Sequence, residues 1–492
     1  MKHRGAGRLF RNRCYVAAAL TLACLVLATA GCAPSVLEGR AASMLYDPDR
    51  VGGLHATDGL SGVRPDAPGP QGNVESTDGG ENDRLSLLAV NDIQEFWSAN
   101  YPQYFAGAYT PVSSIRSYDS TNPSSARVCG KTVVYGDPNA SYCRRDDSIS
   151  WDRGFLIPNA RKYFGDAAVA GVLAHEFGHA VQTRAHTVHL LTRTIVKEQQ
   201  ADCFAGVYLH WVAQGGSKRF ALNTTGGLDH VLAGGITLRD PTDESENAPG
   251  AHGSALDRVG AFQEGFNGDA ATCAAIDHNE IERRNVGLPA GLQNYPSGDS
   301  EPGEMPITED SLTLLMQTLS QIFHPAATPT LTVVGAPACA DARPSPPASY
   351  CPATNTINVD LAGLQQIGAY ADNKNRELLQ GDDTAFSVVT SRYMLAVQHQ
   401  QGISLTGERA ALRTACLTGV AQREMATPVA LPSGRTLVLT AGDLDEAISG
   451  LLTNHLVASD ANGDSVPAGF TRIVAFRSGL VGNAAQCDGN FP

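Results

Sequence analysis

The sequence predicts an α+β fold that is predominantly helical and organised in two similar halves. Three observations carry this expectation: apolar residues recur at helical spacing, a set of short motifs occurs twice in the same order, and the cysteines fall into matching groups. The 492 residues, 42% apolar and 17% charged, have ordinary globular composition with room for more than one domain. Asp and Glu number 50 against 36 Lys and Arg, and this acidic balance argues against a nucleic-acid partner.

The first 31 residues have the pattern of an export signal. Five basic residues precede a nearly unbroken apolar stretch from Cys14 to Ala30, which ends in small residues. We therefore expect residues 1–31 to be removed and the mature chain to be extracytoplasmic. Cys32 stands where a bacterial lipobox places its lipidated cysteine, although Thr29 occupies a position at which that pattern prefers Leu. A membrane anchor and an ordinary cleaved signal are the alternatives.

Residues 32–84 are predicted to form a lipidated, flexible tether. From about residue 36 the segment is rich in Gly, Pro, Asp and Ser and lacks apolar periodicity, which is the composition of a flexible linker. A lipid on Cys32 would hold the protein at the cell membrane. The sequence leaves the oligomeric state open.

Beyond residue 84 the chain contains one pattern twice. A Ser-Tyr-Cys triplet with a strand-like segment behind it recurs, as do a Cys-containing helical motif and an arginine further along. The matching pairs are 141–152 with 349–360, 201–207 with 414–420, and Arg258 with Arg472. Because their order never changes, we expect a catalytic domain at 85–285, a Gly/Pro-rich linker at 286–308 and a second copy at 309–492. Short strands are expected near 131–135 and 148–152.

Eight cysteines follow Cys32, four in each predicted copy. An even number in an exported chain indicates disulfides, each of which would contribute roughly 3 to 4 kcal/mol to stability. Four cysteines allow three pairings in each copy. Joining those nearest in sequence gives the expected set: Cys129 with Cys143, Cys203 with Cys273, Cys339 with Cys351, and Cys416 with Cys487.

A buried helix is predicted from Asp166 onward, and its C-terminal half carries the motif His175-Glu176-Phe177-Gly178-His179. Two imidazoles at positions i and i+4 lie on one helix face, so both can bind one Zn²⁺, while Glu176 lies beside a bound water. Two core histidines bonded to backbone carbonyls are the alternative.

A second predicted helix supplies two carboxylates. Glu198 follows His179 by 19 residues, and a hairpin through 184–190 would return it over the first helix as a third metal ligand. Three protein ligands with an open fourth position are typical of catalytic zinc. Asp202, one turn later, could accept a hydrogen bond from a ligand histidine. The alternative for both is a charge on a helix surface.

These segments resemble the bacterial neutral zinc metallopeptidases. The resemblance rests on HEFGHAVQ, on EQQADCFAG and on a His-Gly-Ser turn at His252 followed by Arg258, and it covers about residues 120–275. With the lipobox and the second half, the whole chain resembles the mycobacterial lipoprotein peptidases. The resemblance implies a zincin-like domain with Zn²⁺ bound by His175, His179 and Glu198, and with Glu176 as the catalytic base.

The residue types also suggest a reaction. Zinc would activate a water and polarise a peptide carbonyl, and Glu176 would move the proton from the water to the leaving amine. His252 is the candidate for a second donor to the oxyanion, and an ordinary surface histidine is the alternative. Arg258 is expected to be part of this site or to have a structural role. The structural role is the alternative because the second half has an arginine, Arg472, at the matching position.

The second copy retains none of the residues assigned to this chemistry. At or near the positions of His175, Glu176, His179, Glu198 and His252 stand Ser391, Arg392, Leu395, Ala411 and Val466. The sequence therefore predicts a lipid-anchored zinc endopeptidase followed by a degenerate, non-catalytic repeat. The alternative is a non-catalytic cell-surface binding module on a duplicated metallopeptidase fold. The presence of Glu176 favours the enzyme, because a binding module has no need of a general base.

Overall fold

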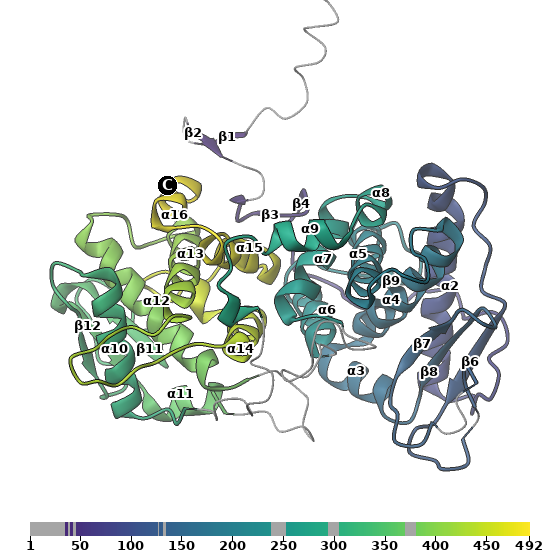
Figure 1. Cartoon of the computed structure of the whole chain (residues 1–492), viewed down its shortest axis with the longest axis horizontal. Helices are drawn as coiled ribbons and strands as arrows, with labels where there is room; N and C mark the ends of the chain where they lie inside the picture. The colour runs from purple at the N-terminus through teal and green to yellow at the C-terminus, as the bar shows by residue number, and fades with distance from the viewer. Residues whose placement is uncertain are drawn as a thin grey trace, which may run out of the picture.

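The computed structural model describes residues 35–37, 40–42, 46–125, 127–130, 134–237, 252–293, 305–369 and 380–492. The predicted signal at 1–31 and Cys32 lie outside these ranges. Helices dominate the described part of the chain, and two small three-stranded sheets lie toward opposite sides of the molecule (Figure 1). Among the described helices, none combines the length and the apolar character needed to cross a membrane.

The first half begins with a long helix and a mixed sheet. The strands lie in the order β6-β8-β7, with β6 parallel to β8 and β7 antiparallel to it, so β7 is an outer strand. The elements are α2 (Glu81–Tyr104), β6 (Ser114–Tyr118), β7 (Ala140–Cys143), β8 (Ser148–Asp152), α3 (Leu156–Phe164), α4 (Asp166–Ala185), α5 (Thr194–Ala213), β9 (Phe220–Ala221), α6 (Gly226–Thr237), α7 (Ala255–Asn267), α8 (Ala270–Ala274) and α9 (His278–Arg284).

Two of the local predictions can be compared directly with these elements. The helix expected from Asp166 is α4, and the strand expected at 148–152 is β8. The strand expected near 131–135 is wrong for its described part, since Val134 and Tyr135 lie in a loop and residues 131–133 lie outside the described ranges. Val134 is buried in a small separate cluster with Tyr118 and Val128, so an apolar run that looks like a strand packs here as a loop.

The second half presents the same kinds of element in the same order. Its sheet has the order β10-β12-β11 and the same combination of parallel and antiparallel pairing, and Tyr350 faces Ile357 as Tyr142 faces Ile149. The elements are α10 (Glu309–Phe323), β10 (Thr330–Thr332), β11 (Ala348–Cys351), β12 (Thr356–Val359), α11 (Leu361–Ile367), α12 (Asp382–Gln400), α13 (Glu408–Met425), α14 (Ala441–Thr453), α15 (Gly469–Leu480) and α16 (Ala484–Asn490).

All four predicted disulfides are confirmed. Two of them join the outer strand of each sheet to the loop before it, and the other two join α5 to α8 and α13 to α16. The long pairs span 70 and 71 residues. In each half a disulfide therefore joins one long helix, α5 or α13, to a short helix near the C-terminal end of that half.

The two halves share one continuous apolar core. Helices α6 and α7 of the first half lie against α14 and α15 of the second, near the middle of the molecule (Figure 1). Part of the expected linker at 286–308 also packs here, because Leu292 is buried and its short 3-10 turn (Ala290–Leu292) contacts α14. Residues 294–304 of that linker lie outside the described ranges.

The expected flexible tether is wrong for residues 46–80, which are folded onto the body of the protein. The segment forms β3 (Arg50–Val51), β4 (Leu54–His55) and β5 (Gly62–Val63), and β5 pairs with β9. Val51 is fully buried, and Arg64 Nε donates to the carbonyls of Ser217 and Phe220. Composition alone misses such a segment, because a few apolar side chains and long-range backbone bonds are enough to hold it.

We predict that a chain starting at residue 81 is less stable than one starting at residue 46. Loss of the buried Val51 and the half-buried Val63 should lower the free energy of unfolding by about 3 kcal/mol or more, at roughly 1.5 to 3 kcal/mol for each buried valine. Denaturant titration of both proteins would measure this difference. Equal unfolding midpoints and slopes would show that residues 46–80 do not contribute to the folded body.

Candidate metal centre

The candidate centre is built where α4 and α5 cross at close range. Gly178 in α4 makes this approach possible, because a Cβ atom there would lie 2.7 Å from the Cα of Ala201 in α5, closer than real atoms come. The loop between the helices begins with His186 in a left-handed conformation (φ 55°), which ends α4. The reversal lays the first turns of α5 over the face of α4 that carries the two histidines.

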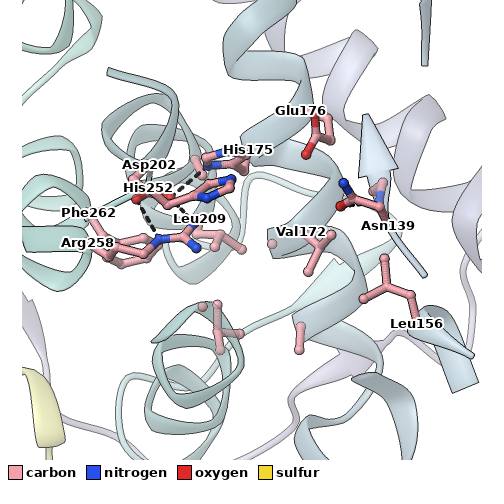
Figure 2. A pocket seen from close by; sticks show the side chains of 16 residues that line it. Asn139, Leu156, Val172, His175, Glu176, Asp202, Leu209, His252, Arg258 and Phe262 are labelled. Carbon is pink, nitrogen blue, oxygen red and sulfur yellow. Dashed lines mark hydrogen bonds and ion pairs between the residues drawn. The ribbon is translucent and has the colours of Figure 1, made fainter. Parts of the chain in front are cut away.

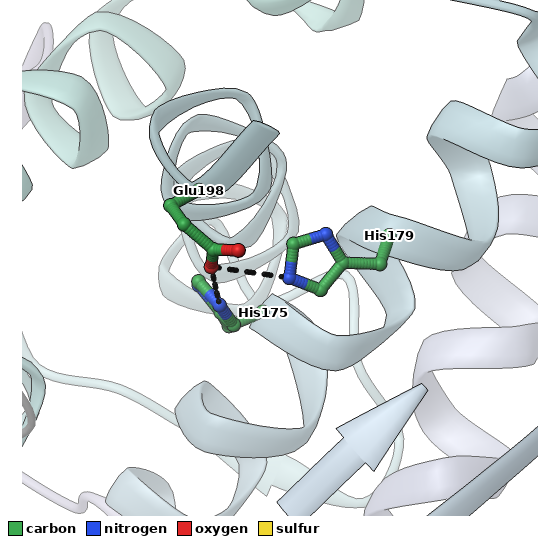
Figure 3. A group of neighbouring side chains, drawn as sticks. All are labelled: His175, His179 and Glu198. Atoms are coloured by element: carbon green, nitrogen blue, oxygen red, sulfur yellow. Dashed lines mark hydrogen bonds and ion pairs between the residues drawn. The ribbon is translucent and has the colours of Figure 1, made fainter. Parts of the chain in front are cut away.

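Three side chains converge at this crossing. Nε2 of His175 and Nε2 of His179 each lie 3.2 Å from the same oxygen, Oε2 of Glu198 (Figure 3). One potential ligand atom from each of the three residues lies within 4.8 Å of the other two. Two imidazole nitrogens and one carboxylate oxygen form a donor set that suits zinc. The structure thus brings together the three residues that the sequence analysis selected as ligands.

The outer nitrogens of both imidazoles are held by acceptors. Asp202 Oδ1 lies 2.7 Å from Nδ1 of His175, and Gln182 Oε1 lies 3.0 Å from Nδ1 of His179. Asp202 in turn accepts two hydrogen bonds from the Arg258 guanidinium, at 3.0 and 2.7 Å. With Nδ1 donating outward, each Nε2 keeps a lone pair for a metal.

Sequence reasoning selected Asp202 and missed Gln182. Gln182 stands three residues after His179 on the same helix, so its spacing could have indicated the contact. The bond between Arg258 and Asp202 joins residues 56 positions apart, and no local pattern indicates it.

Glu176 lies beside the three ligands without joining them. Its Oε2 accepts a hydrogen bond of 2.9 Å from the backbone N–H of Tyr142 in the outer strand β7. Glu176 and His175 line a cavity of about 120 Å³ together with Asn139 and Ala140 at the start of β7 (Figure 2). Burial raises the pKa of the Glu176 carboxyl, while the positive charge of the two neighbouring histidines opposes this shift.

His252 also reaches this cavity, from the segment just before α7. Its Nε2 lies 3.8 Å from Glu198 Oε2, and its ring centre lies 6.4 Å from that of His175. The side chain is 38% exposed, far more than the 10% of His175. His252 therefore faces the site from its open side, as a residue that contacts a bound molecule would (Figure 2).

The electrostatics of the centre favour cations at the imidazole positions. Burial opposes protonation of His175, yet the carboxylates of Asp202 and Glu198 raise its pKa to about 10. Glu198 likewise raises the pKa of His179 against the effect of burial. Burial would raise the pKa of the Glu198 carboxyl, but the two histidines hold it well below its usual range. Positive charge is thus stabilised where a metal ion would bind.

Comparison with known proteins agrees with this geometry. Residues 41–276 match the model of the family described as "Putative neutral zinc metallopeptidase". The uncharacterized protein YpfJ from two Escherichia coli strains, K12 and O6:H1, is 31% identical over 157 residues, which cover 27% of this chain and 52% of each relative. The chain thus spans about half the length of the curated relatives it matches. No solved structure matches the chain. The first half is therefore similar to a family of zinc metallopeptidases.

We predict that zinc binding near neutral pH releases protons and strengthens as the pH rises. The pKa of His175 is raised to about 10, so in the zinc-free protein its ring carries a proton that a metal must displace, and the pKa of His179 is raised as well. At least one proton per zinc should be released at about pH 7. Calorimetric titration in buffers of different ionisation enthalpy measures this number. An affinity that stays constant between about pH 6 and 9 would contradict the assignment of both rings.

Proposed function

We propose that the protein is a zinc-dependent endopeptidase whose catalytic site lies in the first half. One observation carries this proposal: the donor atoms of His175, His179 and Glu198 converge beside Glu176, a half-buried carboxylate that borders a cavity and is not one of the proposed ligands. A structural metal site has no use for such a carboxylate, whereas hydrolysis needs a base there. Bound zinc would supply an activated water and polarise the peptide carbonyl.

Each polar residue then has a distinct part in the reaction. Glu176 takes a proton from the attacking water and passes it to the leaving amine, while the Tyr142 N–H holds one of its oxygens in place. His252 donates a hydrogen bond to the oxyanion that forms from the carbonyl. Asp202 and Gln182 keep the two ligand imidazoles in the tautomer that faces the metal.

The outer strand β7 is the proposed site of substrate binding. Asn139 and Ala140 line the cavity, and β8 covers only one edge of β7. An extended peptide that pairs with the other edge would lie along the cavity, with one of its peptide bonds next to Glu176. In this binding mode the strand forms hydrogen bonds with the backbone of the peptide and does not need a chain end. It therefore suits cleavage at an internal peptide bond.

We also propose that the second half is a degenerate copy of the first that lacks catalysis. The order of elements, the strand register and the spacing of the disulfides all support this interpretation. Arg392 is fully buried, and its guanidinium donates to the Ala348 carbonyl and to Ser459 Oγ at 2.8 and 2.9 Å. It fills the space between helix and outer strand that Glu176 borders in the first half.

An extracytoplasmic location at the cell membrane is part of the proposal. Four disulfides in one chain suit an oxidising compartment. The lipid on Cys32 remains a prediction from the sequence, as do the cleaved signal and cell-surface peptide or protein substrates.

We predict that Glu176→Gln retains zinc and loses hydrolysis, because glutamine keeps the size of the side chain and removes the proton acceptor. Bound zinc and cleavage of a peptide library should be measured on the same preparation. His179→Ala is the matched variant, since it should lose the metal itself. Cleavage by Glu176→Gln at the wild-type rate would remove Glu176 from the mechanism, and a wild-type protein that binds zinc without cleaving any peptide would favour a binding module.

A second prediction concerns His252. Its replacement by alanine should lower kcat by about 10²-fold with little change in zinc affinity, as expected for the loss of one donor to the transition state. His230, on α6, provides a control histidine, because it is not one of the residues that line this cavity. If His252→Ala and His230→Ala reduce kcat/KM equally, and by less than about threefold, His252 has no part in the reaction.

A further inference from the structure

The two halves cap each other's helices in a reciprocal manner. Asp445 in α14 of the second half accepts a hydrogen bond of 2.9 Å from the backbone N–H of Ala255, the first residue of α7 in the first half. Asp229 in α6 of the first half accepts one of 2.8 Å from Gly469, the first residue of α15 in the second half. Each carboxylate thus satisfies a free N–H at a helix start and opposes the positive end of the helix dipole.

The arginines near the starts of the two capped helices bind different carboxylates. Arg472 in α15 is fully buried and donates 2.6 Å back across the interface to Asp229. Arg258 in α7 instead donates to Asp202, the residue that fixes His175. The helix that Asp445 caps is therefore linked to the candidate metal centre by the bond from Arg258 to Asp202.

Asp445 lies close to two groups of that centre along the chain. Ala255, which it binds, stands three residues after His252 and three residues before Arg258. Gly253 between them has a φ of 93°, and Ser254 closes a capping box with Asp257, so the turn leading into α7 is defined by several local bonds. A shift of the first turn of α7 would move His252 and Arg258 together. Asp445 is only 1% exposed, so water has little access to replace its hydrogen bond to Ala255.

We propose that Asp445 is a positioning residue of the metal centre, and that the second half is thereby a working part of the site in the first. This inference rests on the proposed function. In this proposal Asp445 acts through α7 and does not contact the metal or the substrate. Its hydrogen bond holds the first turn of α7 in place, and this turn positions Arg258. Arg258 in turn holds Asp202 in its hydrogen bond with His175. Loss of a residue that bonds directly to a metal-binding histidine, as Asp202 does to His175, weakens metal binding by roughly 10- to 100-fold, and loss of Asp445, which acts through Asp202, should lie at the lower end of this range.

The experiment compares zinc affinity, kcat and KM for three variants of the mature chain. Asp445→Ala should weaken zinc binding about tenfold and lower kcat more than it changes KM. Asp445→Asn should behave like the wild type, because its amide oxygen can accept the same hydrogen bond. Gln263→Ala is the matched control: Gln263 lies in the second half of α7 and donates 3.1 Å across the interface to the Phe470 carbonyl, away from the centre. It should leave zinc affinity unchanged.

Three outcomes would overturn the inference. The first is that Asp445→Ala keeps wild-type zinc affinity and kcat. The second is that Asp445→Asn is as impaired as Asp445→Ala. The third is that Gln263→Ala weakens zinc binding as much as Asp445→Ala does, because this result would indicate a general effect of the interface. If Asp445→Ala does not fold, Asp445→Leu makes the same test, because it fills the volume without an acceptor. Zinc affinity is read by chelator competition and does not depend on hydrolysis, so a protein that binds zinc and cleaves nothing would contradict the proposed function alone.

Discussion

Asp202 places a negative charge inside the protein at the point where three helices meet. A buried carboxylate costs several kcal/mol unless it is paired and hydrogen-bonded. Here α4 supplies His175 and α7 supplies the two N–H groups of Arg258, and together they hold the pKa of Asp202 well below its usual range despite burial. The position of His175, the first of the proposed metal ligands, therefore depends on how α7 packs against α5, and not on the motif in α4 alone.

The second half has a similar arrangement of helices but no carboxylate at the position of Asp202. Ala415 stands at the position of Asp202 in the matched motif, so the arginine of this half, Arg472, has no carboxylate of its own half to bind. It binds Asp229 of the first half instead. Each half has a fully or nearly fully buried arginine at the start of the same helix, and the choice of partner decides whether this arginine supports a metal site or an interface.

Close helix packing is the part of the scaffold that both halves share. A Cβ at Gly206 would meet the Phe262 carbonyl oxygen at 2.3 Å, and one at Gly419 would meet that of Phe476 at 2.1 Å. These glycines let α5 lie directly against α7 and α13 directly against α15, while the long disulfides join the same two helices, α5 and α13, to α8 and α16. This explains why Cys and Gly recur in the matched motifs at 201–207 and 414–420 while the ligands do not.

The sequence indicated the parts of the centre that depend on local spacing. The i and i+4 histidines, the carboxylates one turn apart on α5 and the disulfides all follow from patterns within short segments. The features that were missed include the packed segment at 46–80, the hydrogen bond of Tyr142 to Glu176 and the bond of Arg258 to Asp202, which depend on contacts between residues far apart in the chain, where periodicity carries no signal. Gln182 and the strand β7 were also missed, although their partners His179 and β8 lie nearby in the sequence.

The shared interface gives the second half a structural role even if, as proposed, it has no catalytic activity. Separating the halves would expose the apolar faces of α6 and α7 that complete the core, and it would leave Arg472 without its carboxylate. Ser391, Arg392 and Leu395, which stand at the positions of His175, Glu176 and His179 in the proposed duplication, are all fully buried. Packing against the first half is thus a sufficient physical role for the second, and substitutions at these three positions are restricted by core packing.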